Sequence, residues 1–183
     1  MLARYALTDE LPDKSVGFQH CVLVDLSIFD VLGRLIQYHS QNKIKMDSKL
    51  LLEKINAHCK GTLMETLNIE YVAIDQNSMT AKMPVNKSVF QPDGVLHGGA
   101  TLALAESVGS AAAQVLMGKA KAQIRGLEIS GNHVKSVRSG YVWAKATVLH
   151  QGRTTQLWQV HVTDEQGDLV SVIKFTTMIL NQG

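Results

Sequence analysis

The residue with the clearest chemical potential is Glu106, a lone carboxylate inside a long apolar segment. Residues 94–118 read GVLHGGATLALAESVGSAAAQVLMG, and Glu106 is their only formally charged side chain before Lys119. A helix this apolar is expected to be buried nearly all round. Burying a carboxylate costs free energy unless a hydrogen bond or an opposite charge compensates for the lost water. A buried carboxylate therefore more often serves a function than not. The alternative is a paired structural acid, and Ser110, four residues further on, can donate it a hydrogen bond.

The start of the same segment offers hydrogen-bond donors. Gly98 and Gly99 leave the first backbone N–H groups of the helix unshielded, and the helix dipole directs its positive end there. Such a terminus suits a developing oxyanion. A plain glycine-rich helix entry is the alternative, just as His97 could be a capping or core histidine and Gln91 an ordinary loop residue.

The spacing of these groups has a geometric consequence. Gly98 and Glu106 are eight residues apart, which is about 12 Å along a helix. One reacting carbonyl cannot contact both groups if they belong to the same helix. If both act on one substrate, they must come from different copies of the chain. The sequence therefore predicts an obligate homo-oligomer with composite sites at a two-fold interface.

Basic residues are concentrated after this helix. Against the single acid Glu128, seven occur in the segment 119–153, namely Lys119, Lys121, Arg125, Lys135, Arg138, Lys145 and Arg153. This excess could receive a polyanion such as a set of phosphates, or it could be an ordinary solvated strand face. The chain has no GxxxxGK[ST] or GxGxxG motif, so ATP or NAD binding is not expected.

The elements that must position these groups follow from the hydrophobic pattern. A helix capped by Asp47 or Ser48 and ended by Gly61 is expected, with a short helical piece at Leu63–Leu67. Alternation predicts strands at 69–74 and 79–85, then about 126–134, 140–150, 154–163 and 168–180, with the long helix at about 96–117 between the two groups. Such an antiparallel sheet must bury one face, and the long helix is the only large apolar element available to cover it. The expected fold class is α+β.

Composition limits the remaining possibilities. The 183 residues are 45% hydrophobic and 19% charged with a net charge of +2, which is typical of a soluble globular protein. We expect no nucleic-acid or membrane partner, no targeting segment and no metal site, since HxxxH and HExxH spacings are lacking. Cys21 and Cys59 are far apart, which favours a reduced, cytoplasmic protein. Residues 1–45 are interpreted as an N-terminal extension without a chemical role, and residues 46–183 as the domain.

The motif around Glu106 resembles a known family. The stretches Gln91–Ala100 and Leu104–Ser110 are similar to those of the hot-dog-fold acyl-CoA thioesterases, closest to the branch acting on hydroxybenzoyl-CoA and 1,4-dihydroxy-2-naphthoyl-CoA. Similarity runs from about Lys49 to Leu180. The resemblance implies an antiparallel sheet wrapped around a long central helix, with dimers that pair into tetramers.

The resemblance also implies residue roles. Glu106 would be the nucleophile or general base, Gly98 N–H and Gln91 would polarise the thioester carbonyl, His97 would position the loop, and Ser110 would orient the carboxylate or water. The coenzyme A channel would be lined by His133, Val134, Lys135, Ser136, His150, Gln151, Gly152, Arg153, Thr154 and Thr155. By its charge, Arg138 is a further candidate for binding phosphate. Coenzyme A would enter only as part of the substrate, and no separate cofactor is expected.

Several functional alternatives remain at this point. An aromatic acyl-CoA, including dihydroxynaphthoyl-CoA in menaquinone biosynthesis, is favoured by the branch that the motif resembles. A broad proofreading role on misacylated carriers is equally compatible. Hot-dog dehydratases space their acid differently from the preceding Gly-Val-Leu, and a non-enzymatic acyl-CoA-binding module would not need Glu106.

Overall fold

The computed structural model describes residues 48–116 and 122–181, which belong to one compact unit of the chain. The predicted extension, residues 1–45, lies outside the described residues, as do Cys21, Lys119 and Lys121. Within the described part, no helix is both long and apolar enough to cross a bilayer.

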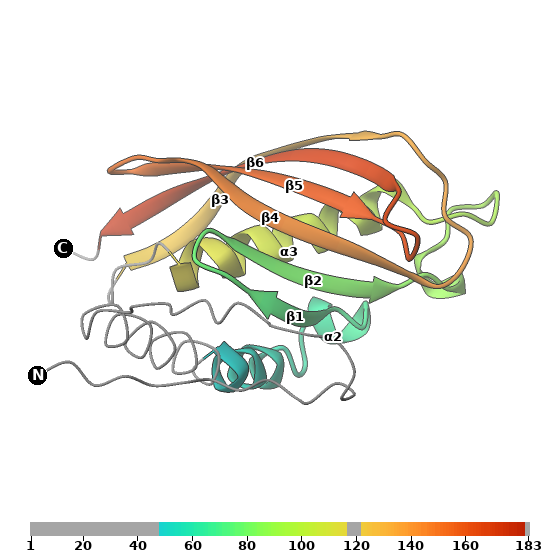
Figure 1. Cartoon of the computed structure of the whole chain (residues 1–183), viewed down its shortest axis with the longest axis horizontal. Coiled ribbons are helices and arrows are strands. Elements are labelled where there is room, and N and C mark those ends of the chain that lie inside the picture. Colours follow the sequence, from blue (N-terminus) through green and yellow to red (C-terminus); the bar gives the residue numbers. More distant parts are fainter. Residues whose placement is uncertain (1–47, 117–121, 182–183) are drawn as a thin grey trace, which may run out of the picture. The chain divides into compact units, whose positions relative to one another are not determined.

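A six-stranded antiparallel sheet forms the body of this unit (Figure 1). Its strands are β1 (Glu70–Ile74), β2 (Ser78–Pro84), β3 (Ala122–His133), β4 (Tyr141–Gln151), β5 (Thr155–Thr163) and β6 (Leu169–Asn181). They lie in the order β1-β2-β4-β5-β6-β3, so β1 and β3 are the two edges. Residues 48–58 are helical and are followed by α2 (Leu63–Thr66) and, after β2, by the short 3-10 helix Lys87–Val89.

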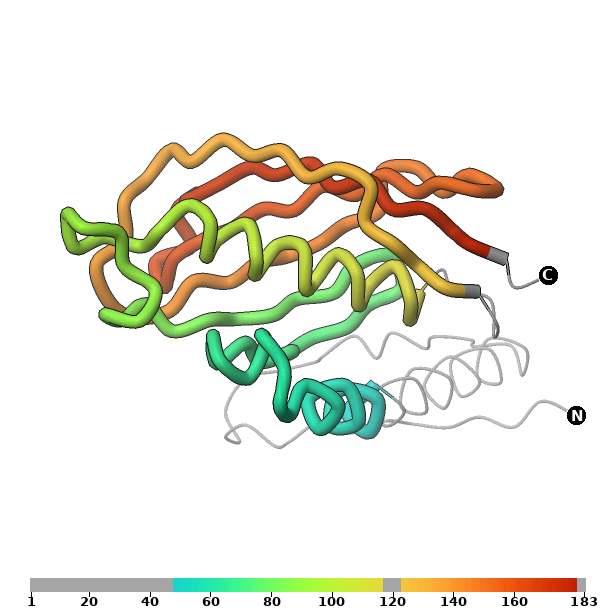
Figure 2. Tube along the Cα trace, turned by 180° about the vertical axis from the view of Figure 1, so that it is seen from behind, coloured from blue at the N-terminus to red at the C-terminus, as the bar shows by residue number. Residues whose placement is uncertain are grey.

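The long helix α3 (Gly98–Leu116) lies against one face of the sheet, which curves around it (Figures 1 and 2). Alternate strand residues point at the helix and are fully buried, among them Met79, Ala81, Met83, Trp158, Val160 and Phe175. Small helix residues allow close approach. A Cβ on Gly109 would lie 2.5 Å from Cδ1 of Phe175, so only glycine fits there. The predicted α+β architecture and hot-dog arrangement are thereby observed.

The turns and helix ends also follow the sequence. Gly61 ends the first helical segment with φ +73°, a conformation that glycine adopts without strain. The β5–β6 turn is closed by hydrogen bonds from the N–H of Asp164 to the carbonyl of Asp168 and from Gly167 to Asp164. Most predicted boundaries lie within one residue of the observed ones, and two differ by more: α3 begins at Gly98 rather than Leu96, and β3 begins four residues before Gly126.

The prediction that α3 is buried nearly all round is wrong for a single chain. Gly99, Glu106 and Gln114 are exposed, and their spacing of seven and eight residues places them along one side of the helix. The opposite side carries the buried residues Leu104, Ala105, Val108 and Ala112. Glu106 thus lies on the exposed stripe of α3, next to the edge strand β3.

Candidate active site

Backbone hydrogen bonds to two other segments hold the loop that leads into α3. Leu96 donates its N–H to the carbonyl of Val137 at 2.8 Å, and His97 donates to the carbonyl of Val89 at 2.9 Å. Two residues before Leu96, Gly94 adopts φ +75°, and its N–H donates to the carbonyl of Gln91. The start of α3 is therefore held rigidly, and rigid donors are what stabilise a developing charge best.

Two imidazole rings pack onto the first residues of α3 because both are glycines. The N–H of Gly99 donates to Nδ1 of His97 at 2.8 Å. A Cβ on Gly98 would lie 2.8 Å from Nε2 of His133, so the absence of a side chain admits that ring. The N–H of Gly98 has no partner among the hydrogen bonds of the described residues. Of the two predicted donors, Gly98 is thus the one available to a substrate, while Gly99 serves to orient His97.

A cavity of about 180 Å³ opens beside Gly98. Its lining is Gln91, Val95, Leu96, Gly98, Thr101, His133, Lys135, Ser136, Val170 and Ser171. Five of these residues were expected from the sequence in two separate motifs, and the structure brings the two motifs together. Ser171 and Thr101 were missed. Ser171 is a fully buried polar residue whose Oγ lies 2.8 Å from Nδ1 of His133, and its only sequence signal was a polar side chain at an inward-facing strand position.

Glu106 does not line this cavity. Its carboxylate lies against the edge strand β3, where Oε1 is 3.1 Å from the Cβ position of Gly126. The site residues of one chain thus fall into two groups. We call Gln91, His97, Gly98 and His133 the donor half, and Glu106 with Ser110 the acid half. Both halves depend on α3, and its length keeps them apart.

Ser110 lies one turn beyond Glu106 and is partly exposed. No hydrogen bond joins these two described side chains, so the predicted orientation of the carboxylate by Ser110 is not formed within the single chain. The neighbouring Ser107 instead donates to the carbonyl of Ala103 at 2.7 Å. The role of Ser110 stays a prediction.

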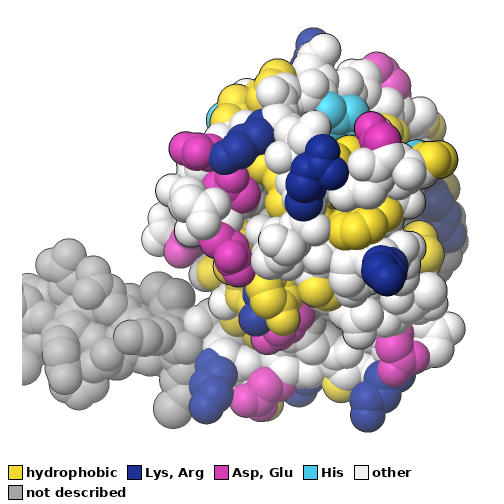
Figure 3. Space-filling model, turned by 90° about the vertical axis from the view of Figure 1, so that its right-hand side faces the viewer, with side chains coloured by type: hydrophobic (Ala, Val, Ile, Leu, Met, Phe, Trp, Pro, Cys, Tyr) yellow, Lys and Arg dark blue, Asp and Glu magenta, His cyan; other side chains and the backbone are white. Residues whose placement is uncertain are grey.

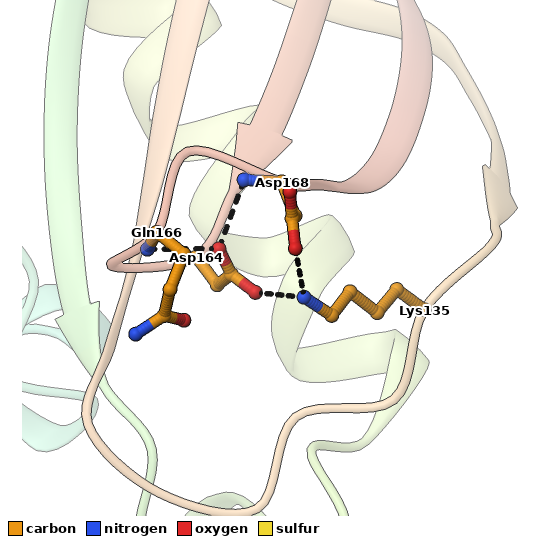
Figure 4. Close-up of polar contacts among 4 residues, drawn as sticks. All are labelled: Lys135, Asp164, Gln166 and Asp168. Carbon is orange, nitrogen blue, oxygen red and sulfur yellow. Dashed lines mark hydrogen bonds and ion pairs between the residues drawn. The ribbon is translucent and has the colours of Figure 1, made fainter.

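Lys135 is engaged in an ion-pair network rather than free (Figure 4). Its ammonium contacts the carboxylates of Asp164 and, at 2.7 Å, of Asp168, which flank the β5–β6 turn. Asp164 also accepts the backbone N–H groups of Gln166 and Asp168 at 3.0 and 2.9 Å. The ammonium hydrogen bond is the main reason why the pKa of Asp164 is lowered, and the same contact raises the pKa of Lys135. A phosphate would have to compete with two carboxylates for this lysine.

The remaining predicted channel residues are dispersed. Val134 is exposed, and Arg138 donates to the carbonyls of Asp93 and Gly94 at 3.4 Å, so it braces the loop before α3. The segment 150–155 forms the β4–β5 hairpin. Thr155 pairs with Met178 on β6, whereas His133 pairs with Ser171. Seven strand residues separate these two rows, which is about 23 Å. One chain does not bring the two predicted channel segments together.

Figure 3 shows the end of the molecule where the loop before α3 and the β5–β6 turn lie. Basic and acidic side chains are interspersed there around exposed hydrophobic surface, and histidine is visible among them. The electrostatic field at this end is therefore not of a single sign. Among the described residues, no cluster of three or more His, Cys, Asp or Glu side chains is arranged to hold a metal ion.

Comparison with known proteins agrees with this geometry. The profile of the thioesterase superfamily matches residues 93–171. The 1,4-dihydroxy-2-naphthoyl-CoA hydrolase of Escherichia coli is 41% identical over 132 residues, covering 72% of this chain and 96% of its own. A proofreading thioesterase of Cronobacter turicensis is 38% identical over 131 residues, covering 72% and 95%. A solved thioesterase structure from Haemophilus influenzae superposes with a TM-score of 0.69 at 38% identity, covering 71% and 90%.

The chain therefore belongs to the thioesterase superfamily. It has the hot-dog fold and is a thioester hydrolase, as the motif around Glu106 predicted. The matched segment includes the start of α3, Glu106 and the loop with Lys135.

The ion-pair network around Asp164 gives a prediction with a defined pH dependence. We expect Asp164→Asn to lower the melting temperature more than the matched variant Asp168→Asn, because the Asp168 carboxylate is exposed and, among the described residues, contacts Lys135 alone. The pKa of Asp164 lies below its ordinary value of 3.8. Its charged form therefore stabilises the folded state above that value, and this contribution is lost as the pH falls through the lowered pKa.

The measurement is thermal unfolding of wild type and both variants from pH 7 down to pH 2. The difference in melting temperature between wild type and Asp164→Asn should be largest between about pH 5 and 7 and should shrink below about pH 4. A difference that persists unchanged at the lowest pH would contradict the ion-pair explanation.

Proposed function

We propose that the protein is an acyl-CoA thioesterase that hydrolyses an aromatic acyl-CoA to the free acid and coenzyme A. The observation that carries the proposal is that the same helix presents an accessible carboxylate, Glu106, and, two turns away at its amino end, an N–H of Gly98 that has no partner among the described residues. Hydrolysis of a thioester needs a nucleophile or base for the carbonyl carbon and a donor for its oxygen. The reaction needs water but no further cofactor.

In the proposed chemistry the N–H of Gly98, with Gln91 beside it, binds the carbonyl oxygen of the thioester. Glu106 either attacks the carbonyl carbon and expels the coenzyme A thiolate, or removes a proton from the attacking water. In the first route water then cleaves the acyl anhydride, and in the second the tetrahedral intermediate collapses directly. Both routes give one carboxylic acid and one thiol.

We further propose that the acid half of one chain works with the donor half of a second chain. Strand β3 is an edge of the sheet, and the exposed stripe of α3 that carries Glu106 lies alongside it. Two copies that pair their β3 edges antiparallel would place their α3 helices side by side in opposite directions. The amino end of one helix would then approach the middle of the other. This arrangement supports a homodimer as the smallest active unit.

The acyl group is proposed to be compact and aromatic. The cavity beside Gly98 has a volume of about 180 Å³ and three aliphatic wall residues, Val95, Leu96 and Val170. A cavity of roughly 150 Å³ is sufficient to admit benzene, so one aromatic ring fits this size range. The similarity to the dihydroxynaphthoyl-CoA hydrolase supports the same class and a role in menaquinone biosynthesis.

A proofreading thioesterase that removes wrong acyl groups from carriers is the second candidate. The similarity to the Cronobacter turicensis enzyme supports it. The mixed polar and apolar lining of the cavity, with Gln91, Thr101 and Ser136 among the polar members, does not select one acyl group strictly. The two candidates differ in whether an acylated carrier protein is hydrolysed faster than the matching coenzyme A ester.

The proposed role of Glu106 is tested by Glu106→Gln. The amide keeps the size of the side chain but can neither attack the carbonyl nor accept a proton, so we expect kcat to fall by roughly a thousandfold or more. Because Glu106 is exposed, the melting temperature should stay close to that of wild type. The assay is release of free thiol from benzoyl-CoA. A folded variant that retains wild-type turnover would refute the proposed chemistry.

The substrate class is tested by comparing kcat/KM for acyl-CoA esters of different shape. We expect benzoyl-CoA to exceed acetyl-CoA and palmitoyl-CoA by about tenfold or more, because the cavity wall matches a single ring better than a methyl group or a long chain. For 1,4-dihydroxy-2-naphthoyl-CoA, whose acyl group has two fused rings, the same ranking is expected from the similarity to the Escherichia coli hydrolase. A higher value for palmitoyl-CoA would contradict the aromatic assignment. A benzoylated carrier protein, measured in the same assay, separates the proofreading candidate.

A further inference from the structure

Gly126 occupies an unusual position on the edge strand β3. Glycine weakens a strand, and its presence there often marks a bulge or a place where another group approaches closely. Gly126 does not have the positive φ that would require glycine. The register with β6 shifts just after it, between Gly126 and Glu128. The space that the missing side chain leaves is therefore the property that distinguishes glycine at this position.

That space is occupied by the Glu106 carboxylate and by Phe175. A Cβ on Gly126 would lie 3.1 Å from Oε1 of Glu106 and 3.1 and 3.3 Å from Cε2 and Cζ of Phe175. All three distances are shorter than ordinary van der Waals contact. An added methyl group would thus require one of these two side chains to move.

The two neighbours differ in their freedom to move. Phe175 is buried, and its ring is held from the other side by Gly109, whose Cβ position lies 2.5 Å from Cδ1. Glu106 is exposed, and its carboxylate is the end of a flexible side chain. Within the described residues, no hydrogen bond or ion pair holds this carboxylate. The carboxylate is therefore the group that would yield.

We propose that Gly126 is a positioning residue for the thioesterase reaction: its missing side chain is the gap in β3 into which the Glu106 carboxylate fits, next to the open edge of the sheet. This inference rests on the proposed role of Glu106. Gly126 itself makes no contact with substrate. It determines where the carboxylate stands relative to the carbonyl that the carboxylate must reach.

The experiment compares Gly126→Ala with the matched control Gly131→Ala. Gly131 lies on the same strand and faces the same helix, but a Cβ there would meet Ile173 at 2.8 Å and Leu102 at 3.1 Å, and neither atom belongs to the acid. We expect Gly126→Ala to lower kcat for benzoyl-CoA by about tenfold or more, since small displacements of a reacting group are costly. The KM should stay within about twofold, because the donor half is unchanged. Gly131→Ala should keep kcat within about twofold of wild type.

Thermal unfolding of both variants completes the test. A folded Gly126→Ala protein with lowered kcat, beside an active Gly131→Ala protein, supports the proposal. Unchanged or raised kcat in Gly126→Ala overturns it, as does an equal loss in both variants. Failure of Gly126→Ala to fold also overturns it, because Phe175 packing would then be the reason for the glycine. If Glu106→Gln is active, the proposed function itself fails; if Glu106→Gln is inactive and Gly126→Ala is not impaired, only the positioning role fails.

Discussion

The constraint on which the site depends is the rigidity of α3. Gly98 and Glu106 are fixed on one helix, and eight residues at 1.5 Å each place the backbone of Glu106 about 12 Å along the axis from that of Gly98. No rotation of the Glu106 side chain closes such a distance. A reaction that uses both groups must therefore draw them from two chains, and the stripe of α3 left exposed by its own sheet lies where a second chain would add to β3.

Glycines on α3 and on β3 leave space in which other groups pack closely. Gly109 admits the ring of Phe175, Gly98 admits His133, and Gly126 on β3 leaves room for Glu106. None of these three contacts would survive an added Cβ without movement. The missing side chain of Gly109 lets the helix pack closely against the sheet, and that of Gly98 lets the His133 imidazole lie beside the N–H donor. The missing side chain of Gly126 leaves the space that the Glu106 carboxylate occupies. Packing and chemistry are determined together by these close approaches.

The strands and the long helix could be predicted because one face of each is buried, which imposes a clear alternation. The start of β3 was missed because an edge strand with both faces largely exposed lacks that pattern. The burial of Glu106 was predicted from the apolar composition around it, which cannot show whether the cover comes from the same chain. The partners of Lys135 were also missed, since Asp164 lies 29 residues away and the pair depends on a turn that closes only in the folded sheet. Gln91, Gly98 and His133 could be assigned from the family resemblance, and the structure brings them to one cavity.

The composite site is tested most directly by mixing two inactive variants. Gly98→Pro removes the N–H donor at the first helical position and also displaces the His133 ring, so it disables the donor half as a whole, and Glu106→Gln removes the acid. In a dimer containing one copy of each, one site unites an intact Glu106 with an intact Gly98, and the other site lacks both. Random association on co-expression should therefore restore about a quarter of wild-type thiol release. Co-expressed protein that forms mixed dimers but stays as inactive as either variant alone would contradict a site shared between chains.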